Sequence, residues 1–267
     1  MKNIIIIVLV FLSANTIFSQ SEEDLAKATQ NPLAAMYSLP FQNNTTYGVG
    51  KFERPQNVLN IQPVLPFSLS DKINIVNRII LPVITQPSAT EDKSTTGTGD
   101  ISWSAWLSPS KPGKIIWGVG PVMQIPTASS NEFGSGEFGI GPSFVALTMI
   151  EDWVAGIVTN NVWTFGDKEE NKFVFQYFIN YNFPSFYLVY APIITANWNA
   201  ESDSRWVVPF GGGAGKVIKI GKLPININAQ IFYNAVKPDG VGDWQSRIQI
   251  QFVFPTSGMK EKMKAAN

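Results

Sequence analysis

LPININAQIFYNAV, residues 223–236, is the stretch that determines the fold class of this chain. Apolar side chains recur at every second position from Ile225 to Tyr233, and the positions from Asn226 to Asn234 between them are mostly amides. A period of two residues is that of a β-strand, whose successive side chains point to opposite faces. The stretch therefore predicts a strand with one apolar face and one amide-bearing face.

The same alternation recurs along the rest of the chain, in about twelve segments near the 9–11 residues that a tilted membrane strand requires. Short connections at 70–72, 150–152, 183–185 and 220–222 alternate with longer polar ones at 87–96, 128–135, 166–170, 199–204 and 237–242. Barrels of the up-and-down type have short periplasmic turns and longer outer loops. We therefore expect an all-β fold, a transmembrane up-and-down antiparallel β-barrel of about 12 strands.

The polar face of these strands distinguishes a lumen from a water-exposed surface. A soluble surface carries roughly 25–35% charged residues, whereas this chain has 15% overall and places Asn, Gln, Ser, Thr and Gly opposite its apolar positions. Tryptophans near the segment ends, such as Trp153 and Trp244, fit aromatic girdles at the membrane interfaces. The alternative is a β-sandwich with an aromatic core, and strand length and scarce charge favour the barrel.

Prolines inside the segments are the feature that fits this barrel least, because each removes a hydrogen-bond donor from the ladder. They mark either local kinks or breaks in the expected strands. The prolines concerned are Pro63, Pro66, Pro82, Pro121, Pro142, Pro192 and Pro209.

The chain is expected to consist of four parts. Residues 1–20, with an apolar run from Ile4 to Leu12, have the form of a secretory signal peptide. Residues 21–42 form an N-terminal segment with helical character that could fold into the barrel as a partial plug. Residues 43–255 form the barrel, and 256–267 a periplasmic tail. The expected location is the outer membrane of a Gram-negative bacterium, in contact with its lipid and lipopolysaccharide, with both termini periplasmic.

Several chemistries are excluded or disfavoured by composition. The chain has no histidine and no cysteine, so no ordinary neutral-pH base and no thiolate is available. Carboxylates are scattered, and no metal site and no cofactor are expected. Because Lys+Arg 20 balances Asp+Glu 20, nucleic acid is not an expected partner. These observations argue against an enzyme.

Residues that should line the lumen follow from the strand phase. Arg78, Arg247 and Asp100 could form a selective constriction or a structural cross-lumen ion pair. The amides could bind polar solutes or satisfy one another, and inward aromatic rings could contact an aromatic solute or only fill space. Lumen-side glycines such as Gly118 either permit bending or let the plug come close. The complete set of candidates is Arg78, Asp100, Trp106, Gln176, Phe178, Asn180, Tyr187, Asn228, Gln230, Arg247 and Gln249.

Several segments resemble a bacterial family of outer-membrane barrels named for the meta-pathway of phenol degradation, often mis-titled neuromedin U. The resemblance implies a barrel and, by association, uptake of aromatic compounds, with no catalytic residues. Phe254 at the end of the last segment resembles the terminal aromatic residue that the barrel-assembly machinery recognises. The resembling segments are QNPLAAMYSLPFQNN from Gln30, NVLNIQPVLPFSL from Asn57, GDISWSAWLSPSKPG from Gly99, IWGVGPV from Ile116, TNNVWTF from Thr159, PIITANW from Pro192, WVVPFGGGAGKVIKIGKLP from Trp206 and DWQSRIQIQFVFP from Asp243.

The leading functional hypothesis is a channel or transporter for passive uptake of small, aromatic or amphipathic compounds. The alternative is a structural or adhesive envelope barrel with a filled lumen. A third hypothesis, a histidine-free hydrolase, would need a serine with a lysine or carboxylate base in the outer loops.

Overall fold

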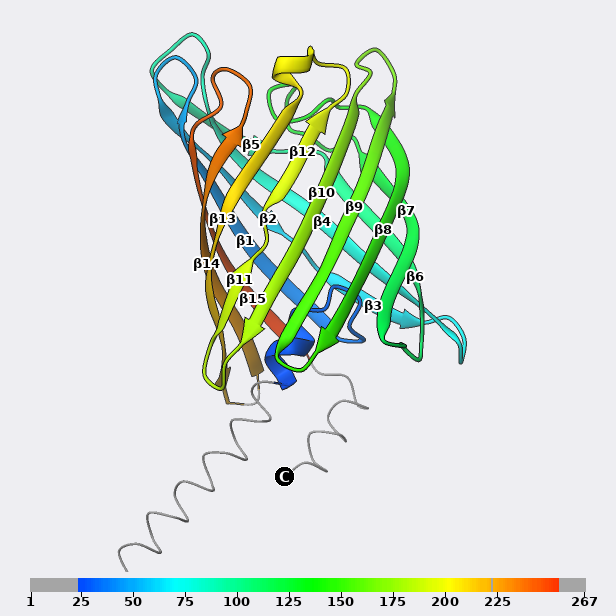
Figure 1. Cartoon of the computed structure of the whole chain (residues 1–267). Helices are drawn as coiled ribbons and strands as arrows, with labels where there is room; N and C mark the ends of the chain where they lie inside the picture. Colours follow the sequence, from blue (N-terminus) through cyan, green and yellow to red (C-terminus); the bar gives the residue numbers. More distant parts are fainter. Residues whose placement is uncertain (1–23, 222, 255–267) are drawn as a thin grey trace, which may run out of the picture.

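The two-residue alternation forms β-strands that pair antiparallel with their neighbours in sequence (Figure 1). This computed structural model describes residues 24–221 and 223–254, so the expected signal peptide and tail lie outside the described residues. A short helix, residues 24–29, precedes the strands, and η1 (Ser202–Ser204) is a single 3-10 turn. The strands are β1 (Tyr37–Val49), β2 (Arg54–Ile61), β3 (Val64–Ser68), β4 (Ile73–Pro87), β5 (Ser94–Thr98), β6 (Ile101–Pro109), β7 (Ile115–Ile125), β8 (Phe138–Ile150), β9 (Trp153–Phe165), β10 (Asn171–Asn182), β11 (Tyr187–Tyr190), β12 (Ile193–Asn197), β13 (Trp206–Ile220), β14 (Leu223–Val236) and β15 (Trp244–Phe254).

The strands close into a barrel of twelve staves, where a stave is one complete crossing of the wall. The sheet has 15 strands because three staves are each interrupted once: β2 with β3, β5 with β6, and β11 with β12. Within the described residues every stave pairs with the next one in sequence, and β1 pairs with β15 from Tyr37↔Phe254 to Tyr47↔Trp244. The predicted up-and-down barrel of about 12 strands is confirmed.

The prolines act in both of the ways considered from the sequence. Pro63 and Pro192 lie at two of the stave interruptions, whereas Pro209 lies beside a register shift within β13. Pro121 and Pro142 occupy opposing positions in paired strands. At the first interruption the neighbouring backbone stays paired, because Gln62 donates to the Pro40 carbonyl and Pro63 accepts from Ile79 N. The wall therefore remains hydrogen-bonded at this interruption.

Strand β1 begins earlier than the sequence indicates. Tyr37 already pairs with Phe254, so residues 37–42 belong to the barrel wall and not to the N-terminal segment, which was expected to extend to residue 42. The sequence signal is hidden because Pro40, an unusual strand residue, stands in the alternation of Tyr37, Leu39 and Phe41.

The two faces of the wall differ in chemistry as predicted. Large apolar side chains are exposed on the outside along most strands, including Leu107, Val119, Ile140, Leu188 and Ile231. Exposed tryptophans lie near both barrel ends: Trp117 and Trp153 near the short turns, and Trp163, Trp198 and Trp244 near the longer loops. An apolar band between aromatic girdles is the outer surface of a membrane-spanning barrel.

No helix within residues 24–221 and 223–254 is long and apolar enough to span a membrane.

Candidate functional site: a cavity in the barrel lumen

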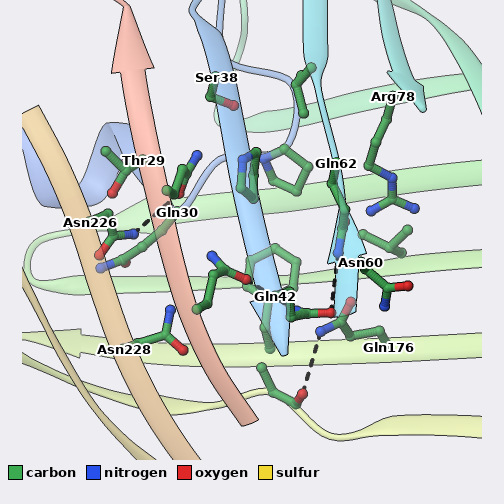
Figure 2. A pocket seen from close by; sticks show the side chains of 18 of the residues that line it. Thr29, Gln30, Ser38, Gln42, Asn60, Gln62, Arg78, Gln176, Asn226 and Asn228 are labelled. Carbon is green, nitrogen blue, oxygen red and sulfur yellow. Dashed lines mark hydrogen bonds between the residues drawn. The ribbon is translucent and has the colours of Figure 1, made fainter. Parts of the chain in front are cut away.

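The barrel encloses a cavity of about 410 Å³. Its wall comes mainly from the amide-bearing faces of β1, β2, β10, β14 and β15, together with β4, β11 and the segment after the N-terminal helix. Figure 2 shows side chains from these elements converging on one space. Amide groups dominate the polar part of the lining: Gln30, Asn31, Gln42, Asn60, Gln62, Asn160, Gln176, Asn180, Asn226, Asn228, Gln230, Gln249 and Gln251.

The N-terminal segment, residues 24–36, lies at the end of the barrel with the short turns. Figure 1 places its helix there, beside the first residues of β1. Leu25 and Leu33 are buried in an apolar cluster with wall residues, and Lys27 Nζ lies 3.4 Å from Asp152 Oδ1 in the β8–β9 turn. A Cβ at Gly118 would lie 3.1 Å from the Leu33 side chain. Glycine therefore suits position 118, because Leu33 of the N-terminal segment packs close to the wall there.

Trp106 is the largest buried side chain of the apolar cluster. It is 0% exposed, its Nε1 donates to Ser143 Oγ at 2.8 Å, and the Arg78 guanidinium carbon lies 4.9 Å from the centre of its ring. Val145, Leu147 and Phe178 belong to the same cluster. Part of the lumen is therefore occupied by packed side chains, and the cavity borders this cluster at Phe178.

Many of the lumen amides satisfy one another. Gln62 donates to Gln42 at 3.2 Å, and Gln42 donates in turn to Gln249 at 3.1 Å. Asn226 donates to Gln251 and accepts from the Tyr187 hydroxyl. Such chains fix the orientation of side chains that would otherwise rotate, which gives the cavity a defined polar lining.

Two amide oxygens of the lining have no protein hydrogen-bond partner although they are buried: Asn180 Oδ1 and Gln230 Oε1. Both atoms are acceptors. They are able to accept hydrogen bonds from water or from a solute in the lumen.

Arg78 and Arg247 line the same cavity but have different surroundings. Arg247 is 4% exposed; its Nε donates to Asn44 Oδ1 at 2.9 Å and its Nη1 to the Ala191 carbonyl at 2.8 Å. Arg78 stacks on Trp106, and its Nε is buried with no partner. Neither forms an ion pair within residues 24–221 and 223–254.

Asp100 lies away from the cavity, between β5 and β6. Its Oδ1 accepts from the backbone amides of Thr127 and Ala128 at 3.1 and 3.0 Å, and its Oδ2 accepts from that of Gly136 at 3.2 Å. It therefore holds the β7–β8 loop in place. The cross-lumen ion pair considered from the sequence does not form in the described chain.

The structure brings together most of the residues predicted to line the lumen. Trp106 faces inward but is covered by the apolar cluster, and Asp100 is engaged by the loop. Those that line the cavity are Arg78, Gln176, Phe178, Asn180, Tyr187, Asn228, Gln230, Arg247 and Gln249.

The prediction omitted Gln42, Asn60 and Gln62, which also line the cavity. The signal for Asn60 and Gln62 was present, because both are polar positions of an alternating segment. Gln42 was assigned to the N-terminal segment and was therefore not considered as part of the wall.

The described part of the chain contains no cluster of three or more acidic side chains arranged to hold a metal ion. In the cavity lining, the titratable residues are Arg78, Arg247 and Tyr187. The cavity thus has no carboxylate or lysine to act as a general base.

No family model and no curated protein sequence matches this chain. Among solved structures, an outer membrane channel from Pseudomonas putida F1 is similar, with a TM-score of 0.60 at 17% sequence identity over 82% of this chain and 94% of that one. The CymD monoaromatic hydrocarbon channel has a TM-score of 0.47 at 10% identity, covering 88% and 92% of the two chains. Outer membrane phospholipase A from Escherichia coli has 0.43 at 12%, covering 84% and 93%. The first likeness establishes a shared outer-membrane barrel fold.

Proposed function

We propose that this chain is an outer-membrane channel for passive uptake of small, aromatic or amphipathic compounds. The observation that carries the proposal is the cavity of about 410 Å³, lined by amides and two arginines, inside a closed barrel whose outer face is apolar. Cavities of roughly 300–1,000 Å³ are the usual size for small-molecule sites. The interior therefore has room for a small solute.

Two further points support the channel over an enzyme. The chain has no histidine or cysteine, and the cavity lining has no carboxylate or lysine, so a hydrolytic mechanism has no base at the site. The similar structure from Pseudomonas putida F1 is itself described as an outer membrane channel. We also assign the chain to the barrel family named for the meta-pathway of phenol degradation, on the sequence segments quoted above.

The proposed orientation places the short turns and both barrel termini in the periplasm. The β1 start and the β15 end lie at the same barrel end as the short turns, as the register Tyr37↔Phe254 requires. Short turns on the periplasmic side are the rule for barrels of this type. In this orientation lipopolysaccharide surrounds the loop end, and the barrel-assembly machinery would insert the chain.

The N-terminal segment is then a partial plug facing the periplasm. It is held by Lys27 with Asp152 and by Gln30 with Asn182, together with Leu25 and Leu33 in the apolar cluster. Among the described residues, these are side-chain contacts and not hydrogen bonds of the strand ladders. Displacement of the segment opens the lumen without unfolding the wall.

A structural barrel with a permanently filled lumen is the second candidate function. The cluster around Trp106 favours it, because Leu25 and Leu33 are buried there at 5% and 7% exposure. If the N-terminal segment never leaves the lumen, the loops would carry the function and the cavity would be a closed compartment.

The test is single-channel conductance of the purified mature chain in planar bilayers, compared with a form lacking Ser21–Met36. We expect steady conductance that rises on deletion. Barrel folding of each form is checked by the shift in gel mobility on heating. Correctly folded barrels that stay silent in both forms would refute the channel and favour the filled-lumen function.

A further inference from the structure

The cavity lining carries charge of only one sign. Arg78 and Arg247 are its charged residues, and the other polar residues are neutral amides and hydroxyls. In the part of the chain that the structure describes, no acidic side chain lies within ion-pair distance of either guanidinium. Because the only charges in the lining are positive and they lie inside the barrel, the cavity attracts anions and repels cations.

Arg78 is the arginine that remains free to bind a solute. Its guanidinium carbon lies 4.9 Å from the centre of the Trp106 ring, a contact that orients the group without using its N–H donors. Its Nε is buried without a partner. Figure 2 shows the guanidinium on the side of the cavity that also carries Asn60 and Gln62. A planar guanidinium held in this way matches the two oxygens of a carboxylate.

Arg247 has a different role because two of its nitrogens already donate to the protein. Nε binds Asn44 and Nη1 binds the Ala191 carbonyl beside the stave interruption at Pro192, and its guanidinium carbon lies 4.9 Å from the centre of the Phe232 ring. These acceptors are neutral, so the positive charge is not compensated. Arg247 therefore adds to the positive potential of the cavity while it ties two parts of the wall together.

Apolar side chains form part of the cavity wall between the amides. The residues Val64, Ile80, Val158, Val174, Phe178 and Ile193 line it together with the two arginines. Val64 stands directly opposite Arg78 in the β3–β4 pairing, and Ile80 is two residues farther along the same face of β4. An anion bound at Arg78 would thus have hydrophobic surface next to it.

We propose that the lumen selects small amphipathic carboxylates, with the carboxylate on Arg78, the hydrophobic body against the neighbouring apolar wall, and Arg247 supplying positive potential. The proposal rests on the proposed channel function and specifies its substrate class. It excludes neutral and cationic compounds of the same shape as preferred solutes.

Binding is measured first, without any need for conduction. Benzoate, benzyl alcohol and benzylamine share a ring and differ in charge at one substituent, so isothermal titration of the detergent-solubilised mature chain compares the three directly. We expect benzoate to bind and the other two to bind at least about tenfold more weakly, the usual scale of one charge-assisted hydrogen bond. Equal binding of all three would overturn the proposal.

Variants separate the two arginines. Arg78→Gln should weaken benzoate binding by about ten- to a hundredfold. Arg78→Lys keeps the charge without the planar fork and should lose only part of that affinity. Arg54→Gln is the control, since Arg54 is paired with Asp92 at the loop end of the barrel, outside the cavity lining. Unchanged benzoate affinity in a correctly folded Arg78→Gln barrel would refute the assignment of Arg78.

Conduction gives an independent readout of the same charge. Under a potassium chloride gradient the reversal potential should show anion preference, and the preference should fall in both Arg78→Gln and Arg247→Gln. Benzoate binding without conductance would refute the channel function while supporting the carboxylate site. Steady conductance with cation preference and no benzoate binding would refute the carboxylate site and leave the channel function standing.

Discussion

The side chains of Gln30 and Asn182 form a reciprocal pair: Gln30 Nε2 donates to Asn182 Oδ1 at 2.8 Å, and Asn182 Nδ2 donates to Gln30 Oε1 at 3.3 Å. Asn182 is also tied to the β8–β9 turn, because its Nδ2 donates to the Asp152 carbonyl at 3.0 Å. Asp152 in turn forms the ion pair with Lys27. The N-terminal segment, proposed above as a plug, and one short turn thus form a single bonded unit.

We predict that Gln30→Ala raises the conductance or the frequency of opening of the channel. The change removes two hydrogen bonds of the plug, each contributing about 1 kcal/mol, and none of the strand ladder. Single-channel recording measures the effect. Gln245→Ala is a matched control, because Gln245 donates to Asn234 at the loop end of the barrel, and the plug lies at the opposite end. Equal changes in both variants would show that any lumen amide affects opening and that the plug contact has no special role.

Trp106 is predicted to stabilise the barrel through both volume and its hydrogen bond. Trp106→Ala should lower the free energy of unfolding by about 3–5 kcal/mol, because it leaves a cavity among Val145, Leu147 and Leu33. Trp106→Phe keeps much of the ring but leaves Ser143 Oγ without its donor, and should cost less. Urea unfolding of the detergent-solubilised barrel measures both.

Trp103→Phe serves as the comparison for the Trp106 variants. Trp103 also donates a hydrogen bond, to Asn77 Oδ1 at 3.1 Å, but it lies outside the apolar cluster. The substitution Trp103→Phe should therefore lower the free energy of unfolding by no more than about 1 kcal/mol. A larger loss for Trp103→Phe than for Trp106→Ala would contradict the central position given to Trp106.

Asp100 is predicted to order one loop and to leave the barrel intact. Asp100→Ala removes the acceptor of the Thr127, Ala128 and Gly136 amides, so residues 126–137 should exchange backbone hydrogens faster and become sensitive to proteases. The urea midpoint of the barrel should change little. Asp92→Ala, which removes an exposed ion pair in another loop, is the control. Unaltered exchange in residues 126–137 would contradict this role.

The faces of the strands could be predicted from sequence because burial on one side forces a period of two. Asn228 and Gln230 were placed in the lumen on that basis, and both line the cavity. Register between strands is a different matter, since a shift of one strand by two residues along its neighbour keeps every side chain on its face. The bond from Arg247 to the Ala191 carbonyl depends on the shape of the closed barrel and is not encoded in any local pattern.

Local interruptions of the strands also limited the prediction of which side chains line the lumen. Asp100 has the strand phase of a lumen residue, yet the stave is interrupted at Gly99 and Asp100 and its carboxylate turns to the loop. This outcome depends on the loop of residues 126–137, because the backbone amides of Thr127, Ala128 and Gly136 donate to the carboxylate. A short polar residue next to a glycine is the sequence signal for such a turn, and it competes with the strand signal.

Gly215 is predicted to be required by the ring of Tyr187. A Cβ at position 215 would lie 2.3 Å from Tyr187 Cζ, and the Tyr187 hydroxyl donates to Asn226 Oδ1 at 2.7 Å. Gly215→Ala should therefore displace the ring, break that hydrogen bond and cost about 1–3 kcal/mol in unfolding free energy. Gly113→Ala, where the nearest neighbouring atom of the new Cβ is at 4.0 Å, should cost much less. Because Tyr187→Ala removes the ring, Gly215→Ala should cost less in that background, where Asn228 Cβ at 2.8 Å remains the close neighbour of the new Cβ, and the two changes should be non-additive. Additive losses in the double variant would mean that position 215 requires glycine because of Asn228 and not because of the ring.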